Sequence, residues 1–285
     1  MVGSHGCFVW YELTTTDADA AKAFYANVVG WGLRDASTPG ADYTLFTAGE
    51  VPVAGLMGLP AEARKMGAQP RWTGYVGVDD VDAATARLKL LGGTVYVPPT
   101  DVPDVSRFSI VADPQAATLA LVKWLNPGQE PSAAPSLPGH VSWHELSAVD
   151  WEKAFAFYVE LFGWQKVDAD VGGLGTYLLF SAGGQTVGGM STKPLTVPMP
   201  FWLYYFNVGD VDAAAKRVKS GGGKILEGPV EARGGNRVAR CTDPQGAMFA
   251  LRAGRPEAVG YFGRAAADDP AAKRLFVPKK TGPSA

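Results

Sequence analysis

The sequence predicts an α+β protein made of two tandem copies of one domain, each copy being a pair of βαβββ units. Three observations support this fold class. Residues 10–31 recur at 143–164 with one constant offset. Residues 72–83 recur at 202–213 with a slightly shorter offset. Within each copy the apolar patterns follow the order strand, helix and three strands, and that order then restarts.

The internal repeat defines the expected domains. Its period is far longer than the roughly 20–50 residues of solenoid repeats, so it indicates a duplicated globular domain. We expect domains at 5–125 and 139–253, a linker rich in Pro, Ser and Ala at 126–138, and a polar tail at 254–285. The first repeated block matches without a gap: Trp10, Glu12, Leu13, Asp17, Phe24, Tyr25, Gly30 and Trp31 recur as Trp143, Glu145, Leu146, Asp150, Phe157, Tyr158, Gly163 and Trp164.

The first βαβββ unit begins with an apolar strand at 8–14. Asp17 or Asp19 can cap the following helix, and Gly30 ends it. Three further strands are expected at 31–34, 43–47 and 51–57, the last two as an antiparallel pair joined by a tight turn.

The second unit restarts the pattern with a strand at 72–78 and a helix at 81–91, capped by Asp79 or Asp80. Its remaining strands are expected near 95, at 108–111 and at 118–124. An Asp-Pro-Gln turn precedes the last strand of each copy, because proline presets the turn and aspartate bonds the backbone two residues on. Ala116 stands where the second copy has Gly246, which predicts an altered turn in the first copy.

Composition excludes several function classes. The net charge of −2, with 19% charged residues and no basic stripe, argues against a nucleic-acid partner. No run reaches the roughly 18 apolar residues that a spanning helix needs, and no signal core is present, so we expect a cytoplasmic protein with no membrane partner. Cys7 and Cys241 are not equivalent in the two copies, which predicts no disulfide framework. The histidines, His5, His140 and His144, do not have HExxH spacing.

The chain resembles the vicinal oxygen chelate superfamily in four features. These are the paired βαβββ units, Ala-x-x-Phe-Tyr at 21–25 and 154–158, Gly-Trp after each first helix, and Asp-Pro-Gln before each last strand. That superfamily includes glyoxalase I, bleomycin-resistance proteins and extradiol dioxygenases, and the resemblance covers nearly all of 8–252. It implies two tandem glyoxalase-like domains, in each of which the paired units form an open curled sheet. It also implies that metal-dependent members hold a divalent ion in this cavity with His, Gln or Glu side chains.

The sequence departs from the metal-dependent pattern at the ligand positions that the resemblance implies. Those positions fall on Trp10 and Trp143, Thr73 and Leu203, and Ala120 and Ala250. Such side chains do not meet the oxygen and nitrogen demands of a divalent ion, so no cofactor is expected. A divalent metal remains possible if a one-residue bulge turns His144 inward, beside Glu145.

Strand alternation predicts what lines each cavity. Trp10 and Glu12 share a face, as do Trp143 and Glu145, Thr73 and Tyr75, Leu203 and Tyr205, Ala120 and Val122, and Ala250 and Arg252. Aromatic walls with one carboxylate suit a flat or amphipathic organic ligand. The expected ligand-binding residues are therefore Trp10, Tyr75, Trp143, Tyr205 and Arg252.

Glu12 and Glu145 are the candidate catalytic residues, because a carboxylate beside apolar walls can have a raised pKa and act as a general base. The structural alternative is that the aromatic residues only pack in a core. In that case the glutamates accept hydrogen bonds from a helix N-terminus or pair with an arginine such as Arg107 or Arg237.

Three functions remain open. The first is a metal-independent small-molecule binding protein of the glyoxalase/bleomycin-resistance type, whose partner is a small organic ligand. The alternative is a metal-dependent lyase, isomerase or dioxygenase that uses His144, Glu145 and Glu12. The third is an interaction protein whose cavities are filled by its own side chains. The copies diverge at Tyr11 against His144 and at Thr73 against Leu203, so we expect the two cavities to differ in ligand preference or only one to be open. A monomer or a homodimer is expected, because fused domains can supply a dimer contact within one chain.

Overall fold

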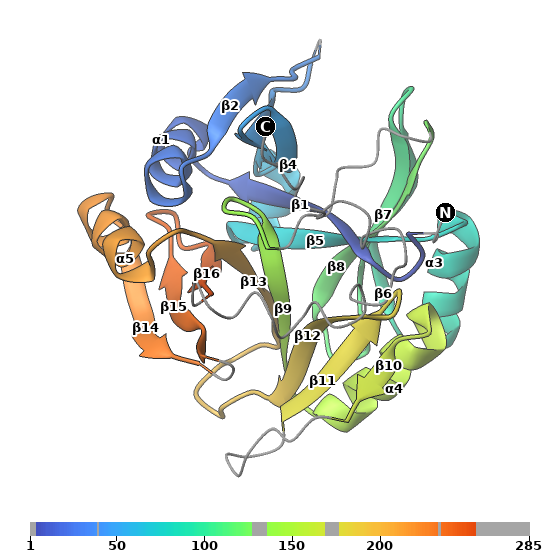
Figure 1. Ribbon diagram of the computed structural model, residues 1–285. Helices are drawn as coiled ribbons and strands as arrows, with labels where there is room; N and C mark the ends of the chain where they lie inside the picture. The colour runs from blue at the N-terminus through green and yellow to red at the C-terminus, as the bar shows by residue number, and fades with distance from the viewer. Residues whose placement is uncertain (1–3, 39, 127–135, 169–176, 233–234, 255–285) are drawn as a thin grey trace, which may run out of the picture.

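The computed structural model describes residues 4–38, 40–126, 136–168, 177–232 and 235–254 and contains two eight-stranded open sheets, one in each half of the chain (Figure 1). The first half contains β1 (Phe8–Thr15), α1 (Ala18–Val29), β2 (Gly32–Asp35), β3 (Tyr43–Ala48), β4 (Val51–Gly58), α2 (Ala61–Lys65), β5 (Arg71–Gly77), α3 (Val81–Leu90), β6 (Thr94–Val102), β7 (Ser106–Ala112) and β8 (Thr118–Trp124). The second half contains β9 (Val141–Ala148), α4 (Trp151–Phe162), β10 (Gln165–Val167), β11 (Tyr177–Ala182), β12 (Gln185–Thr192), β13 (Phe201–Asn207), α5 (Val211–Ser220), β14 (Lys224–Glu231), β15 (Arg237–Thr242) and β16 (Met248–Ala253).

The predicted α+β fold, with two βαβββ units in each half, is confirmed. The sequence patterns did not predict the short helix α2. Most of the expected linker at 126–138 and nearly all of the expected tail at 254–285 lie outside the described residues.

The two sheets have the same topology. The first has the strand order β2-β3-β4-β1-β5-β8-β7-β6, and the second has the order β10-β11-β12-β9-β13-β16-β15-β14. Antiparallel pairing of β1 with β5, and of β9 with β13, joins the two units of each half. This register places Trp10 opposite Tyr75 and Trp143 opposite Tyr205.

The repeated capping residues explain why the longer helices start at equivalent points. Asp17 caps α1 by accepting a hydrogen bond from the backbone N–H of Ala20 at 3.0 Å, a bond that satisfies one of the free donors of the first turn. Asp80, Asp150 and Asp210 do the same for α3, α4 and α5. Gly30 and Gly163 end the first helix of each half in the left-handed conformation that glycine favours.

The helices cover one face of each sheet, and these helix faces build one continuous core from both halves. We call the opposite face of each sheet the site face. It carries a smaller cluster in each half, formed by Trp10, Tyr75, Ala120 and Val122 in the first half and by Leu203, Tyr205 and Ala250 in the second.

Reciprocal hydrogen bonds interlock the two halves. Tyr25 of α1 donates its hydroxyl to Asp243 at 3.1 Å, and Tyr158 of α4 donates to Asp113 at 3.0 Å. Each Asp-Pro-Gln turn therefore holds the helix of the other half. The aspartates also accept two backbone N–H bonds within their own turns, so the same side chains shape the turn and fix the interface.

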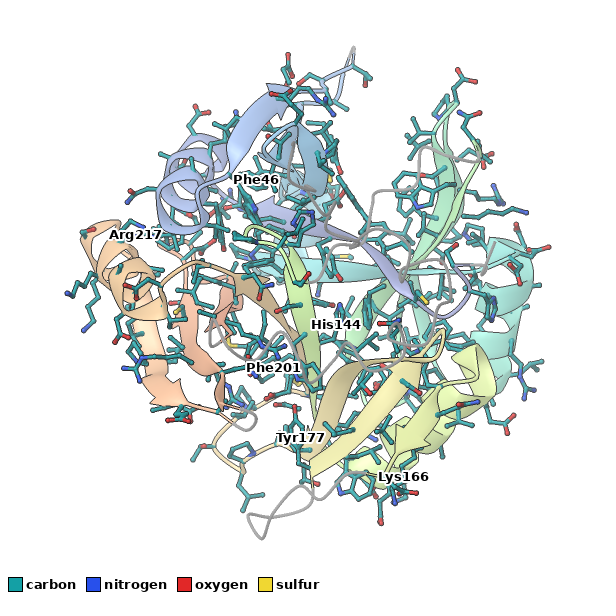
Figure 2. All side chains as sticks on the ribbon, in the orientation of Figure 1. Phe46, His144, Lys166, Tyr177, Phe201 and Arg217 are labelled. Carbon is teal, nitrogen blue, oxygen red and sulfur yellow. The ribbon has the colours of Figure 1, made fainter. Side chains whose placement is uncertain are left out.

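The same exchange is visible in the helix positions, because α1 lies beside α5 and α4 lies beside α3 (Figure 1). Arg217 of α5 donates to the carbonyl of Val28 in α1 at 2.9 Å, and Figure 2 shows it at the junction of these helices. The Trp31 indole donates to the carbonyl of Gly139, and the Trp164 indole donates to that of Gly6. The halves therefore share one core and do not pack as two independent domains.

The altered turn expected at Ala116 is not formed, because both turns have the same hydrogen bonds and a left-handed residue at this position. Ala116 has φ +75°, and the equivalent Gly246 has φ +96°.

We expect Ala116→Gly to raise the free energy of unfolding by about 0.5–1 kcal/mol, because relief of the left-handed strain outweighs the extra entropy of glycine in the unfolded chain. The matched change Gly246→Ala, at a site with no atom within 4 Å of the added Cβ, is expected to cost about 1 kcal/mol. Urea unfolding of the two variants measures both changes. Equal changes of the same sign in the free energy of unfolding would contradict this account.

Candidate functional site

The site face of the first half centres on Glu12 of β1. Its carboxylate accepts hydrogen bonds from the hydroxyls of Tyr43 and Tyr75, both at 3.0 Å. The Trp10 indole N–H donates to the Tyr43 hydroxyl at 3.3 Å. One carboxyl group, two phenols and one indole thus form a connected polar network in a mainly apolar face.

Burial determines the electrostatics of Glu12. Desolvation raises the pKa of its carboxyl, and the hydrogen bonds from Tyr43 and Tyr75 lower it by a smaller amount. Within the described part of the chain, Glu12 forms no ion pair. The raised pKa moves this carboxyl towards its protonated form, in which it can donate as well as accept a hydrogen bond.

Aromatic side chains surround this carboxyl. Trp10 and Trp124 meet edge to face with ring centroids 6.2 Å apart, and Tyr75 lies 6.4 Å from Phe108. Trp124 and Phe108 are half-buried, so this aromatic wall extends towards solvent. The indole N–H of Trp124 is buried and has no hydrogen-bond partner among the described residues, a costly arrangement for a polar group.

The second half repeats the network. Glu145 of β9 accepts hydrogen bonds from Tyr177 at 3.2 Å and from Tyr205 at 2.9 Å, and the Trp143 indole donates to Tyr177 at 3.1 Å. Figure 2 labels Tyr177 beside β11 and Phe201 at the start of β13. The network is therefore a property of the repeat, since each copy supplies an indole, a carboxylate and two phenols at matching positions.

A cation distinguishes the second network from the first. Arg240 of β15 donates to Glu145 at 2.6 Å and to Glu227 at 2.8 Å. The structural alternative in the sequence analysis named Arg107 or Arg237 as such a partner; an arginine does pair with Glu145, but it is Arg240. Arg107 pairs with Asp82 and Asp101, and Arg237 pairs with Asp212, in all cases near the surface.

Arg252 reaches the same face from β16. Its guanidinium lies over the Trp143 ring, 5.5 Å from the ring centroid, and donates to the carbonyl of Ser142 at 3.3 Å. Burial lowers its pKa, and Tyr205 and Tyr177 act in the opposite direction. Arg252 stays protonated, because an arginine pKa remains above the physiological range.

The sequence analysis missed Tyr43, Tyr177 and Arg240. Tyr43 and Tyr177 are equivalent, but loops of different length precede them, so a comparison at fixed offset does not align them. Arg240 corresponds to Ile110 at the offset that aligns 72–83 with 202–213. That charge difference between the copies was a readable signal.

The donor set does not fit a metal site of the kind the resemblance implies. Trp10, Thr73 and Ala120 occupy the implied ligand positions in the first half, and Trp143, Leu203 and Ala250 occupy them in the second. The ranges that the structure describes hold no cluster of three or more His, Cys, Asp or Glu side chains able to hold a metal ion.

His144 lies on the helix face, on the opposite side of β9 from Glu145. Its Nδ1 is 2.7 Å from the carbonyl of Val187 and must donate to it, so Nε2 accepts from the Tyr11 hydroxyl at 2.6 Å. The ring stacks on Phe8, and Figure 2 shows His144 near the middle of the molecule. A register irregularity does occur in β9, between Val141 and Trp143, but it leaves His144 pointing into the shared core. The pairing of His144 with Glu145 as metal ligands is therefore not formed.

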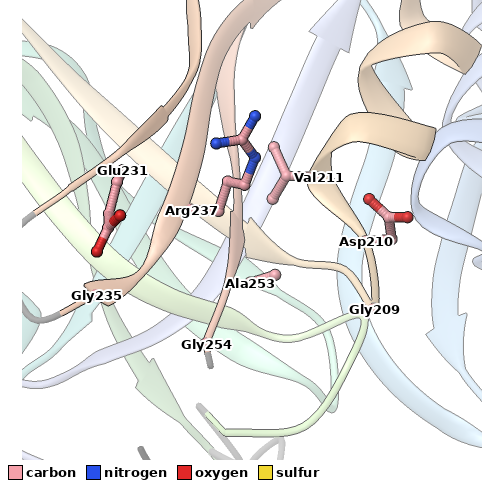
Figure 3. Close-up of a pocket in the computed structure, with 8 residues that line it drawn as sticks. All are labelled: Gly209, Asp210, Val211, Glu231, Gly235, Arg237, Ala253 and Gly254. Carbon is pink, nitrogen blue, oxygen red and sulfur yellow. The ribbon is translucent and has the colours of Figure 1, made fainter. Parts of the chain in front are cut away.

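A separate surface pocket of about 310 Å³ lies beside the start of α5 (Figure 3). Asp210 lines it but is engaged in capping α5, and Arg237 lines it but is paired with Asp212. The pocket lacks the aromatic walls of the site faces. The site faces are therefore the stronger candidates for ligand binding.

No helix among the described residues is long and apolar enough to cross a membrane.

Comparison with known proteins identifies relatives that match most of the chain. The family model described as Glyoxalase/Bleomycin resistance protein/Dioxygenase superfamily matches residues 8–121 and again 138–251. A Mycobacterium tuberculosis protein provisionally named glyoxylase CFP32 is 32% identical, with 87% of this chain and 95% of that protein aligned. The anthracycline biosynthesis protein DnrV of Streptomyces peucetius is 31% identical, with 90% of this chain and 97% of that protein aligned.

Two solved structures show the same fold. The Mn(II)-bound glyoxalase from Novosphingobium aromaticivorans gives a TM-score of 0.61 at 19% identity, covering 87% of this chain and 82% of that chain. The 2,3-dioxygenase LapB from Pseudomonas sp. KL28 gives a TM-score of 0.60 at 11% identity, covering 89% of this chain and 94% of that chain.

Proposed function

The chain belongs to the Glyoxalase/Bleomycin resistance protein/Dioxygenase superfamily, and from this premise we propose that it binds small aromatic or amphipathic compounds on its site faces without a metal ion. The observation that carries the proposal is the half-buried Glu12 carboxyl, which is held by two tyrosine hydroxyls and surrounded by aromatic rings. A polar group fixed within an apolar wall is the usual arrangement in small-molecule sites.

In this proposal the rings supply contact area and Glu12 supplies orientation. The half-buried rings of Phe108 and Trp124 offer surface for a planar ligand, and the buried rings of Tyr75 and Trp10 pack against them. Tyr43 and Tyr75 fix the Glu12 carboxyl, so the ligand meets a preformed hydrogen-bonding group and does not have to order it. In the second half Glu145 takes the equivalent role.

The replaced ligand positions support binding without a metal. Tryptophan at the first-strand position contributes ring surface where a metal-dependent relative would need an imidazole or carboxylate. One of the relatives, DnrV, is named for anthracycline biosynthesis, and anthracyclines are fused-ring aromatic compounds. A planar aromatic ligand is consistent with the tryptophan at the replaced ligand position and with the name of this relative.

A fluorescence titration with N-phenyl-1-naphthylamine, an uncharged aromatic probe, tests the proposal on chelator-treated protein. We expect saturable binding, and we expect Trp10→Ala to weaken it about tenfold, because an aromatic contact of about 1–1.5 kcal/mol is lost. Trp151→Ala is the matched control, since Trp151 is a half-buried indole at the start of α4, away from the site face. Circular dichroism confirms that each variant is folded.

Three results contradict the proposal. One is absence of saturable binding to the untreated and the chelator-treated protein. Another is binding that appears only after Mn(II) or Fe(II) is added, which favours the metal-dependent lyase, isomerase or dioxygenase function. Equal losses in Trp10→Ala and Trp151→Ala place the probe away from the site face and also contradict the proposal.

A further inference from the structure

The two site faces differ in charge at two equivalent positions. Arg252 of the second half corresponds to Val122 of the first, and Arg240 corresponds to Ile110, both at the offset that also aligns the Asp-Pro-Gln turns. Strand pairing confirms the equivalence, because Arg240 lies opposite Ala250 as Ile110 lies opposite Ala120. At these two positions the first half therefore has no charge, whereas the second has two arginines beside Glu145.

The positive charge of Arg240 is already compensated by carboxylates. It forms ion pairs with Glu145 at 2.6 Å and with Glu227 at 2.8 Å. It therefore neutralises the carboxylate that in the first half has no cation. Arg252, by contrast, has no ion pair with any of the described residues.

Arg252 has unused binding capacity. Within the described ranges it forms no ion pair, and its contacts are the Ser142 carbonyl and the Trp143 ring. A guanidinium has five N–H donors, so one bond to a carbonyl leaves most of them for another acceptor. A half-buried cation without a counter-ion is costly, and an anionic group of a ligand removes that cost.

We propose that the second site face binds an anionic aromatic compound and that the first site face binds an uncharged one. On the second face the carboxylate or sulfonate of the ligand pairs with Arg252, and its ring packs near Trp143. This inference rests on the proposed function. Bidentate pairing with a carboxylate or sulfonate is the chemistry to which the planar guanidinium is suited. The first face has the apolar residues Val122 and Ile110 at the positions of the two arginines, so it disfavours a ligand anion at this place.

A matched pair of probes tests the charge preference. 8-Anilinonaphthalene-1-sulfonate has the same rings as N-phenyl-1-naphthylamine and adds a sulfonate. We expect Arg252→Val to weaken binding of the anionic probe about tenfold, as the loss of a charged hydrogen bond implies, and to change binding of the uncharged probe by less than about twofold. Because valine is the residue of the first half, this variant makes the two faces alike at this position.

The reciprocal variant Val122→Arg tests for gain of function. We expect it to add a second site for the anionic probe. Arg252→Gln, which keeps a long polar side chain, is used if Arg252→Val does not fold. Arg237→Gln is the control, since Arg237 lies on β15 but pairs with Asp212 near the surface, and we expect it to leave both probes unaffected.

The results separate this inference from the proposed function. If neither probe binds the wild-type chain, both fail. If the uncharged probe binds and folded Arg252 variants retain full affinity for the anionic probe, the charge assignment is wrong and the proposed function stands. Selective loss in the Arg252 variants together with a gained site in Val122→Arg supports the inference.

Discussion

Replacing Trp164 with alanine lowers the free energy of unfolding by about 3–5 kcal/mol, the range for removal of a buried indole. Trp164 is 2% exposed and stacks on Phe180 and Tyr158 with ring centroids 4.4 Å and 4.9 Å apart. Its indole also donates to the carbonyl of Gly6 in the other half at 2.7 Å. The substitution therefore opens a cavity and breaks a link between the halves. Urea unfolding followed by circular dichroism and tryptophan fluorescence measures the loss.

The same experiment tests whether the two halves unfold together. One continuous core predicts one transition, with both signals changing at the same denaturant concentration. Leu90→Ala is the control, since Leu90 is 81% exposed on α3 and its removal is expected to change stability by less than about 0.5 kcal/mol. Two separate transitions in the wild-type protein, with Trp164→Ala shifting only one, would contradict the interlocked core.

Acid destabilises the protein through His144. Burial lowers the pKa of this histidine from 6.5 to about 4, because the charged ring would lose its hydration, and the hydrogen bond to the Val187 carbonyl acts in the opposite direction. The unfolded chain binds the proton more readily than the folded one between these values. The stabilising contribution is therefore full above about pH 6.5 and is lost as the pH falls towards 4, by about 3 kcal/mol in total.

His144→Gln isolates this effect. The free energies of unfolding of the wild type and the variant are compared at pH 7.5 and at pH 4. The raised pKa values of Glu12, Asp113 and Asp243 act in the opposite direction, but they are present in both proteins and cancel. We expect the advantage of the wild type over the variant to shrink by about 3 kcal/mol at the lower pH. An advantage that does not depend on pH would show that His144 is not held neutral.

Much of the fold could be predicted because the signals are local and occur twice. The aspartate caps, the glycine helix ends and the alternating strands each depend on neighbouring residues, and duplication distinguishes them from chance. The same alternation predicts that Trp10, Tyr75 and Val122 share a face, and the structure places them in one cluster.

The contacts between the halves could not be predicted in this way. Tyr25 and Tyr158 are repeated residues, but nothing local indicates that each reaches the Asp-Pro-Gln turn of the other copy. Such contacts depend on how the two sheets pack. Arg240 was missed because a single charged residue on a strand does not reveal its partner, whereas its comparison with Ile110 shows that the copies differ in charge.

The relation to metal-binding neighbours is one of fold. The Mn(II)-bound glyoxalase is 19% identical to this chain and superposes with a TM-score of 0.61. The positions at which the resemblance implies metal ligands here hold an indole, a hydroxyl and apolar groups. The site faces keep the shared scaffold and present aromatic rings with one fixed carboxyl group, which is the basis of the proposed function.

A crystal structure of the chelator-treated protein with bound N-phenyl-1-naphthylamine, recorded with anomalous data to identify metals, tests the central claim most directly. The proposal predicts probe density against Trp10 and Tyr75, beside the Glu12 carboxyl, with no anomalous peak on either site face. Probe density confined to another part of the molecule, or a metal ion coordinated on a site face beside the probe, would contradict it.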